Sequence, residues 1–308
     1  MINGFSKGLV PDFSKETKLV IGVPSPATTF GGLRTVFTVE RPVNSMSKAS
    51  ITVYNMSRKR CDSIQFGDPI SLMVGADLVF SGFVLSVSQA MNGSDFVVSV
   101  SASDVVTLEN YSRSYNFSFD KMTKGSSVFS LLKTIVKRTA PTLTLTTTQA
   151  ADALIEAKVF KSGYTISGKS WAESIMSVAN SFSMSFSITD TEVRFRSKAE
   201  PADPVLTHVV SAKTGNLVGT PSVKGYVDGK TKHPFKVIDF SMTMDTSVSF
   251  GDSVTVMAQD YSLSGSTFGS SRIRSASGTY TVQGVVHTGD THGTQWTTQV
   301  HGFTKEVV

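Results

Sequence analysis

The chain has 308 residues, 17% charged and 40% hydrophobic, which is the composition of a folded globular protein of two or three domains. Its formal net charge of +5 at pH 7 is small and spread along the chain, which argues against a dedicated nucleic-acid binder. The 45 Ser and 34 Thr residues favour strands and turns over helix interiors, so we expect a β-rich fold. Cys61 is the only cysteine, which excludes an internal disulfide and any zinc site built on several cysteines.

The sequence shows no sign of export or membrane insertion. Met1–Pro11 lacks the apolar run that follows a basic start in a signal peptide. No stretch reaches the roughly 18 consecutive apolar residues that a membrane-spanning helix needs. We therefore expect a protein that is made in a cytoplasm and has no membrane anchor.

Residues 1–108 show the alternation of half-buried strands, with apolar residues at every second position. The segments are Thr35–Glu40, Ile51–Asn55, Pro69–Val74, Leu78–Ser88 and Phe96–Ser101. The last two are joined through Asn92-Gly93, a strong hairpin signal. A short helix over Ser57–Ile64, capped by Ser57 with Cys61 and Ile64 facing inward, interrupts the strands. This region is expected to be a β-barrel or sandwich.

Residues 109–199 change to a mixed α+β pattern. One amphipathic helix is indicated by apolar residues at helical spacing and is ended by Pro141; these residues are Val128, Leu131, Leu132, Ile135 and Val136. The capping box Ser170-Trp-Ala-Glu173 begins a second helix with the apolar face Trp171, Ile175, Val178 and Ala179. Two strands, Met184–Ile188 and Val193–Phe195, follow around a turn at residues 189–191. We expect a small α+β domain, followed by a linker.

Residues 200–308 return to strand patterns and repeat the first third of the chain. Phe66–Met73 matches Phe250–Met257 at an offset of 184, and Phe80–Val100 aligns more loosely with Tyr280–Val300 at an offset of 200. A Ser- and Gly-rich loop near residues 258–278 would make up the difference. Common turn-and-strand patterns also recur by chance in β proteins, but two blocks in the same order favour a duplicated domain. The predicted fold is mainly β, with two similar tube-type β-barrels, 1–108 and 200–308, flanking the α+β domain.

The repeat has a simple physical basis: a Gly-Asp turn starts a strand, and a hairpin with glycine at its tip carries an aromatic ring into the core. Its residues are Phe66, Gly67, Asp68, Gly93 and Phe96 in the first copy, and Phe250, Gly251, Asp252, Gly293 and Trp296 in the second. We expect Phe96 and Trp296 at equivalent core positions. We also expect Pro69–Val74 and Ser253–Val256 to lie at open barrel edges, where neighbouring chains could pair.

Gly163–Ser170 matches the phosphate-binding pattern G-x-x-x-x-G-K-[ST] and leads into a helix. Val237-Ile238-Asp239 could serve as the magnesium-holding partner of such a loop. The context argues against nucleotide binding, because Tyr164–Ile166 alternate like a strand and no βαβ pattern surrounds them. The simpler interpretation is a strand, a turn through Gly168 and the Ser170 cap.

Other chemistry is weakly indicated. Among the five histidines, His287 and His292 lie near Asp290, and His301 could approach them across a hairpin to form a metal or general-base site. The alternative, which we favour, is an ordinary exposed hairpin tip. No nucleophile elbow appears, and Cys61 occupies an apolar helix position, so we expect no catalytic residue, cofactor or metal.

One stretch between residues 113 and 138 is basic, with Asp120 its single acid. Its basic residues are Arg113, Lys121, Lys124, Lys133, Lys137 and Arg138. A basic face can meet nucleic acid or an acidic protein. Because few aromatic residues accompany it, we expect a solvated helix face or a protein interface rather than a single-strand binding site.

The arrangement resembles the baseplate hub proteins of tailed bacteriophages of the contractile type. Ile51–Ser57, Phe66-Gly-Asp, the long hairpin and Ser103-Asp104 are similar to that family's first barrel, and Gly163–Glu173 is similar to its middle domain. The most specific segment is Gly289-Asp-Thr-His-Gly293-Thr-Gln-Trp296, a hairpin tip similar to that of the second barrel. These motifs are structural, and none is catalytic.

The resemblance implies a homotrimer whose six barrels form a ring between a sixfold tail tube and a threefold central spike, with a channel through which DNA passes. Its partners would be the tail tube protein, the spike protein and other baseplate proteins, within a virion tail assembled in the host cytoplasm. No lysozyme-like or peptidase segment is present, so no lytic activity is implied. The alternatives from other classes are a nucleotide-binding enzyme using Gly163–Ser170, and a secreted adhesin, which the absent signal peptide disfavours.

Overall fold

The computed structural model describes most of the chain, and its described residues are 17–22, 28–30, 32–103, 114–119, 128–139, 143–156, 163–188, 192–198, 203–227, 234–258, 262–263 and 276–305. Most of them are in β-strands, as the composition predicts. The strands assemble into one 14-stranded sheet and two smaller sheets. No described helix is long and apolar enough to cross a membrane.

The N-terminal unit is an antiparallel run of strands in the order β2-β1-β5-β6-β7-β4-β3. The bounds are β1 Thr17–Ile21, β2 Thr28–Phe30, β3 Thr35–Pro42, β4 Lys48–Tyr54, β5 Pro69–Val74, β6 Asp77–Asn92 and β7 Asp95–Ser103. All five predicted segments are strands. Their alternating apolar residues form one buried face, since every second residue is buried along β4, β5 and β3 up to Val39.

The short helix α1 (Arg58–Asp62) also lies in this unit, and Cys61 on it is buried as predicted. Ser57 occupies the N-cap position, but its side chain makes no capping hydrogen bond, so the predicted cap is wrong in this respect. Its backbone carbonyl accepts the first hydrogen bonds instead, from the Arg60 and Cys61 amides.

The C-terminal unit has the strand order β13-β16-β18-β19-β15-β14-β17. The bounds are β13 Asp203–Ser211, β14 Leu217–Val227, β15 Pro234–Thr243, β16 Asp252–Met257, β17 Ser262–Leu263, β18 Gly278–Asp290 and β19 Trp296–Lys305. From β13 to β14 this order parallels β1-β5-β6-β7-β4-β3 of the first unit. One pairing differs: β13 is parallel to β16, whereas β1 is antiparallel to β5.

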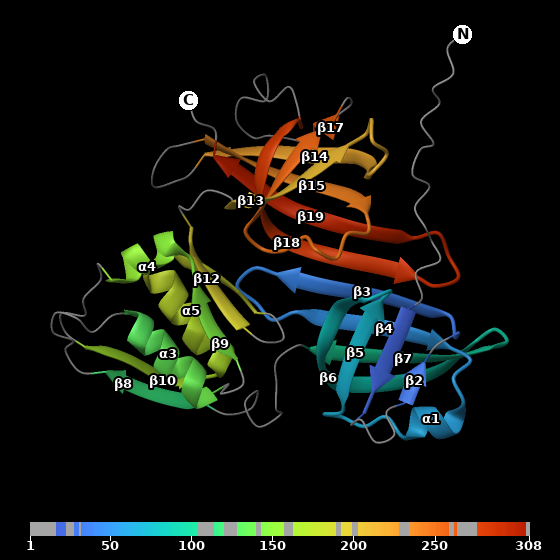
Figure 1. Ribbon diagram of the computed structural model, residues 1–308. Helices are drawn as coiled ribbons and strands as arrows, with labels where there is room; N and C mark the ends of the chain where they lie inside the picture. The colour runs from blue at the N-terminus through green and yellow to red at the C-terminus, as the bar shows by residue number, and fades with distance from the viewer. Residues whose placement is uncertain are drawn as a thin grey trace, which may run out of the picture.

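The two units are joined edge to edge by β18 and β3, which lie side by side in Figure 1. The joint is antiparallel and runs from Gly284 opposite Pro42 to Asp290 opposite Val36. It unites the described strands of the N- and C-terminal units in one open sheet, in which no closed barrel is seen. The prediction of two closed barrels is therefore not confirmed, because β3 and the second half of β18 use their edges to join the units.

Pro69–Val74 and Ser253–Val256 are not open edges, which corrects the prediction. β5 lies between β1 and β6, and β16 lies between β13 and β18. Their alternating apolar residues, such as Leu72 and Val254, are fully buried. Sequence alternation reveals a buried face but not which strand lies at an edge.

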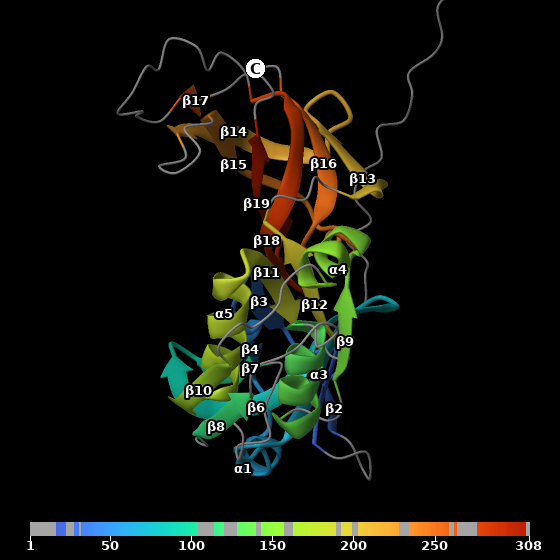
Figure 2. The ribbon, with the colours of Figure 1, turned by 90° about the vertical axis from the view of Figure 1, so that its left-hand side faces the viewer.

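The middle unit packs helices against two small sheets (Figure 2). Its elements are β8 Tyr115–Phe119, α3 Val128–Thr139, β9 Thr144–Thr147, α4 Gln149–Glu156, β10 Tyr164–Lys169, α5 Trp171–Ser181, β11 Met184–Ile188 and β12 Glu192–Ser197. The two predicted amphipathic helices are confirmed as α3 and α5. α4 and β9 were not predicted, and the predicted turn at residues 189–191 lies outside the described residues.

The capping box of α5 is confirmed. The Ser170 hydroxyl accepts from the Glu173 amide, and the Glu173 carboxylate accepts from the Ser170 amide at 2.9 Å. The Ser170 hydroxyl also donates to the Glu173 carboxylate at 2.8 Å, and the two bonds that this carboxylate accepts, first the one from the Ser170 amide, hold the pKa of Glu173 below its usual value. All four residues of the predicted apolar face, Trp171, Ile175, Val178 and Ala179, are buried.

Three hydrophobic clusters form, one for each unit. Some residues cross a boundary: Trp296, at the start of β19, is buried in the cluster of the N-terminal unit, and the partly buried Met244 also packs against that cluster. The Trp296 ring meets that of Phe37 edge to face, with centroids 5.8 Å apart. Trp296 thus ties the C-terminal hairpin to the core of the N-terminal unit.

Candidate functional site

The two Phe-Gly-Asp turns have the same hydrogen bonds. Gly67 and Gly251 both adopt positive φ, at 86° and 90°, which glycine tolerates best. The Gly67 amide donates to the Val84 carbonyl at 2.8 Å, and the Gly251 amide donates to the Val282 carbonyl at 2.9 Å. In each turn the aspartate then accepts from the backbone amide three residues before it, at 2.8 Å for Asp68 and 2.7 Å for Asp252.

The hairpins that follow also correspond residue by residue. Both pairs of strands carry an irregularity at the same place, between Val84 and Ser86 and between Val282 and Gly284. Val87 then pairs with Val100 as Val285 pairs with Val300. The offset is therefore 198 along the first strand of the hairpin and 200 along the second, because the second copy has the longer tip.

Phe96 and Trp296 occupy equivalent register positions, opposite Met91 and Gly289 respectively. Trp296 is 9% exposed, whereas Phe96 is only partly buried. Gly93 and Gly293 both lie in the turns of these hairpins. A side chain at Gly293 would approach the Asp290 carboxylate, whose pKa is lowered by its ion pair with Arg34 at 2.8 Å.

The second turn is covered by the middle unit and the first is not. The buried Arg196 side chain donates to the Gly251 carbonyl, and Phe250 is 9% exposed while Phe66 is 57% exposed. In the N-terminal unit, Asn44 makes two hydrogen bonds to Phe186 of β11. The Asn44 amide donates to the Phe186 carbonyl, and the Phe186 amide donates to the Asn44 side-chain oxygen, each at 2.9 Å. The middle unit is therefore anchored to both halves of the large sheet.

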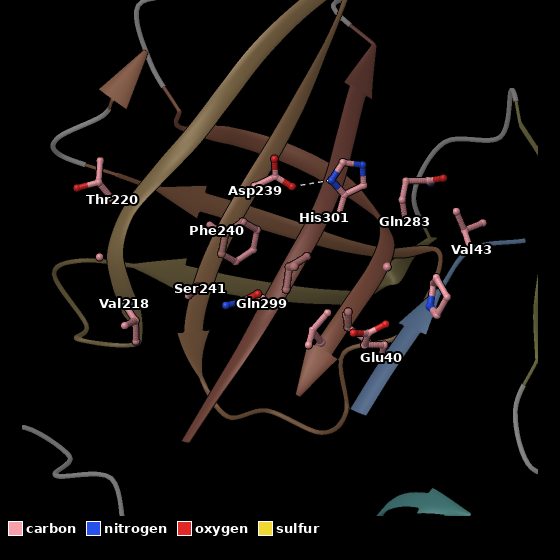
Figure 3. Close-up of a pocket in the computed structure, with 16 residues that line it drawn as sticks. Glu40, Val43, Val218, Thr220, Asp239, Phe240, Ser241, Gln283, Gln299 and His301 are labelled. Carbon is pink, nitrogen blue, oxygen red and sulfur yellow. Dashed lines mark hydrogen bonds and ion pairs between the residues drawn. The ribbon is translucent and has the colours of Figure 1, made fainter. Parts of the chain in front are cut away.

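A cavity of about 630 Å³ lies beside the joint (Figure 3). It opens on the face of the sheet that is turned away from the hydrophobic clusters, here called the outer face. Its lining follows the strand register: one row across five strands consists of Glu40, Val286, Gln299, Ser241 and Val218. Gly284 and Gly219 add no side chains and leave room. The hollow thus lies where these two glycines interrupt the side chains on this face of the sheet.

The cavity contains a histidine–carboxylate pair. His301 Nδ1 lies 2.6 Å from Asp239 Oδ1, and both side chains are about half exposed. A nucleophilic mechanism would need a hydroxyl hydrogen-bonded to this histidine. Among the described residues His301 has no such bond, so the pair acts as a surface cross-strand contact between β15 and β19.

The same outer face carries a row of hydroxyl side chains that crosses both units. Seven successive register partners make the row: Ser86, Ser101, Ser50, Thr38, Thr288, Thr297 and Thr243. All are at least partly exposed. Nearby charges lie beside opposite charges, with Lys48 opposite Glu40 in register and Arg34 bound to Asp290. The seven side chains that define this face, here called the hydroxyl face, are themselves uncharged.

His287 is the histidine that the sequence interpretation misplaced. It is fully buried at the joint, opposite Val39, rather than exposed near a hairpin tip. His301 lies opposite Gly284 on the neighbouring strand, whereas the residue opposite His287 is Thr298. His208 is elsewhere, 3.3 Å from Asp252 and 3.5 Å from Asp245, and His233 lies outside the described residues. No metal-binding cluster of His, Cys, Asp or Glu occurs in the described part of the chain.

The phosphate-loop-like segment is a strand, as its alternation predicts. β10 pairs with β8, Gly168 adopts positive φ and Ser170 caps α5. Lys169 Nζ donates to Ser177 Oγ on α5 at 3.2 Å. An extended strand does not converge its amides on a phosphate, so this geometry gives no support to nucleotide binding.

The basic run is only partly described. Lys133, Lys137 and Arg138 are exposed on α3, and Arg113, Lys121 and Lys124 lie outside the described residues. The exposed side of α3 is thus basic, while Leu131, Leu132 and Ile135 on its other side are fully buried.

Comparison with known proteins places this fold among tail proteins. No protein-family model matches the sequence, and no curated protein matches it in sequence. The structure is similar to the 43 kDa tail protein of prophage MuSo2 from Shewanella oneidensis, with a TM-score of 0.61 and 9% identity over 94% of this chain and 98% of that one. A tail protein from Neisseria meningitidis gives a TM-score of 0.61 and 10% identity over 94% and 97%.

A third similar structure is a component of the type VI secretion system of E. coli, itself similar to the bacteriophage T4 tail proteins gp27 and gp5. It gives a TM-score of 0.61 and 10% identity over 92% of this chain and 76% of that one. At this identity the likeness shows a shared fold, and it extends over nearly the whole chain. The chain has the fold of these tail proteins.

Proposed function

We propose that this chain is a structural hub protein of a contractile phage tail baseplate. Three copies would form a ring that joins the sixfold tail tube to the threefold central spike and leaves a channel for DNA. The observation that carries the proposal is the internal joint. Two units with the same strand order, matched turns and matched hairpins already pair edge to edge within one chain, through β18 and β3.

The duplication proposed from the sequence, with units near 1–108 and 200–308 around a middle unit near 109–199, is supported by this correspondence and by the three separate clusters. Two similar units per chain would let three chains present six similar faces to a tube. The partners are the tail tube, spike and neighbouring baseplate proteins, and the location is the virion tail, assembled in the host cytoplasm.

The hydroxyl face is suited to line the channel. Short neutral side chains offer hydrogen bonds to water, and phosphates would meet few unpaired cations, so passing DNA would not be held. The exposed basic side of α3, with the other residues of the basic run, would face neighbouring baseplate proteins instead. The protein has no catalytic or cofactor role in this proposal.

The proposal is tested by electron microscopy and sedimentation of the purified 33.0 kDa chain, alone and with its spike partner. A closed ring of three chains is expected. A species that stays monomeric at micromolar concentrations under both conditions would contradict the hub function.

A further inference from the structure

One edge of β6 has no strand partner beyond Phe83 among the described residues. β6 pairs with β5 only through Asp77–Phe83, although it continues to Asn92. β18 has the same division: Gly278–Thr281 pairs with β16, and Gly284–Asp290 then pairs with β3. The free edge of β6 therefore corresponds to the edge of β18 that makes the internal joint.

The strand that corresponds to β3 is β14. Ile51 on β4 and Phe240 on β15 are equivalent because they pair with Val100 and Val300. Following the register outward, Lys224 of β14 corresponds to Glu40 of β3, and Tyr226 corresponds to Pro42. The outer edge of β14 pairs only at Ser222 and Val223, with the two-residue strand β17, among the described residues.

We propose that the free edge of β6 pairs antiparallel with the outer edge of β14 in a second copy of this chain. The internal joint sets the register: Glu40 lies opposite Val286, so Lys224 of the second copy would lie opposite Ser88. Pro42 lies opposite Gly284, so Tyr226 of the second copy would lie opposite Ser86. In the single chain, β17 pairs with Ser222 and Val223 at this edge. The second copy would replace β17 there when the full joint forms.

Burial supports this assignment. Val285 and His287, on the edge that is joined, are 3% and 0% exposed. Their equivalents on β6, Val87 and Gln89, are partly buried and exposed. A second copy would cover the β6 residues as β3 covers those of β18.

Exposed apolar side chains point to the same two edges. Leu85 and Met91 on β6 are 36% and 62% exposed, and Val218 and Tyr226 on β14 are 41% and 47% exposed. Large apolar residues along an unpaired edge promote pairing with another chain. A joint between different edges is heterologous, so it builds a ring when its rotation closes. The ring of three rests on the proposed function, whereas the joint follows from the internal repeat.

The test is disulfide cross-linking of paired cysteine variants of the full chain under mild oxidation. Ser88→Cys with Lys224→Cys, and Ser86→Cys with Tyr226→Cys, place cysteines directly opposite each other. The matched controls exchange partners: Ser88→Cys with Tyr226→Cys, and Ser86→Cys with Lys224→Cys. Cys61 stays in place because it is buried.

We expect at least about tenfold more linked chain for the matched pairs, because side chains directly opposite lie about 5 Å apart and those displaced by two residues lie about 7–8 Å apart. Equal linking in all four variants, or none in the matched pairs, would overturn the joint. A closed ring without matched links would leave the hub function standing without this joint. Matched links in an open or two-copy assembly would support the joint and contradict the hub function.

Discussion

Acid should weaken the joint between the two units through His287. The His287 Nδ1 atom lies 2.9 Å from the Thr298 hydroxyl, and that hydroxyl donates its own proton to the Asp245 carbonyl at 3.2 Å. Nδ1 must therefore carry the donated hydrogen. Nε2 is buried without a hydrogen-bond partner among the described residues, so a proton added there would have no acceptor.

Burial, with a smaller effect from Arg41 and an opposing one from Asp245, lowers the pKa of His287 from 6.5 to about 4. The pKa of His287 is lower in the folded chain than in the unfolded chain. The free energy of unfolding is therefore highest above about pH 6.5, where the ring is neutral in both states, and it falls as the pH is lowered toward 4. A difference of about 2.5 pKa units corresponds to a loss of about 3 kcal/mol by about pH 4.

The assay is urea unfolding followed by circular dichroism between about pH 7.5 and 4, on the unmodified chain and on His287→Gln, whose amide can still donate to Thr298. Other groups titrate in this range, so the difference between the two chains is the measured quantity. The unmodified chain should lose about 3 kcal/mol more than His287→Gln across the range. His301→Gln, at the exposed pair with Asp239, is the matched control and should keep the full pH dependence. Parallel pH curves for the unmodified chain and His287→Gln would refute the reasoning.

The other predictions concern the hairpins and the phosphate-loop-like segment. Trp296→Ala should destabilise the chain by about 3–5 kcal/mol, because a buried ring and its contact with Phe37 are lost. Phe96→Ala, at the equivalent but partly buried position, should cost clearly less, and denaturant unfolding of both variants measures the difference. An equal cost would contradict the deeper packing of Trp296 in the core of the N-terminal unit. Lys169→Ala should remove only the bond to Ser177 and leave assembly unchanged. Calorimetric titration of either chain with a magnesium nucleotide should give no heat, and saturable binding that depends on Lys169 would revive the enzyme alternative.

Local chemistry made much of the secondary structure predictable. The alternation of Pro69–Val74 and the helical spacing around Leu131 each specify a buried face within a few residues. The capping box at Ser170 and Glu173 is likewise complete within one turn. The helix α4 was missed although it is amphipathic, because its eight residues make only about two turns. Its one clear signal is Thr148, whose hydroxyl accepts from the Ala151 amide at 3.2 Å.

The candidate site was less predictable, because its residues come from strands far apart in the sequence. A site joining His301 to His287 was the less favoured interpretation of the sequence, and His301 pairs with Asp239 instead, since the strand register and not sequence distance decides which side chains meet. The only feature of the sequence that pointed to the hydroxyl face was its high content of Ser and Thr. The alignment of these residues into a row needs the register of seven strands.

The sequence by itself determined the strands of the N-terminal unit, the helices α1, α3 and α5, and the matching turns, because turns such as Phe66-Gly-Asp and Phe250-Gly-Asp act over a few bonds and adopt the same geometry at both places. Tertiary structure alone decided that β18 pairs with β3, that Trp296 enters the core of the other unit and that His287 is buried. An amphipathic strand can bury its apolar face either in a closed barrel or in an open sheet joined to a neighbour. The choice depends on which edges meet, and hydrophobic alternation carries no record of that.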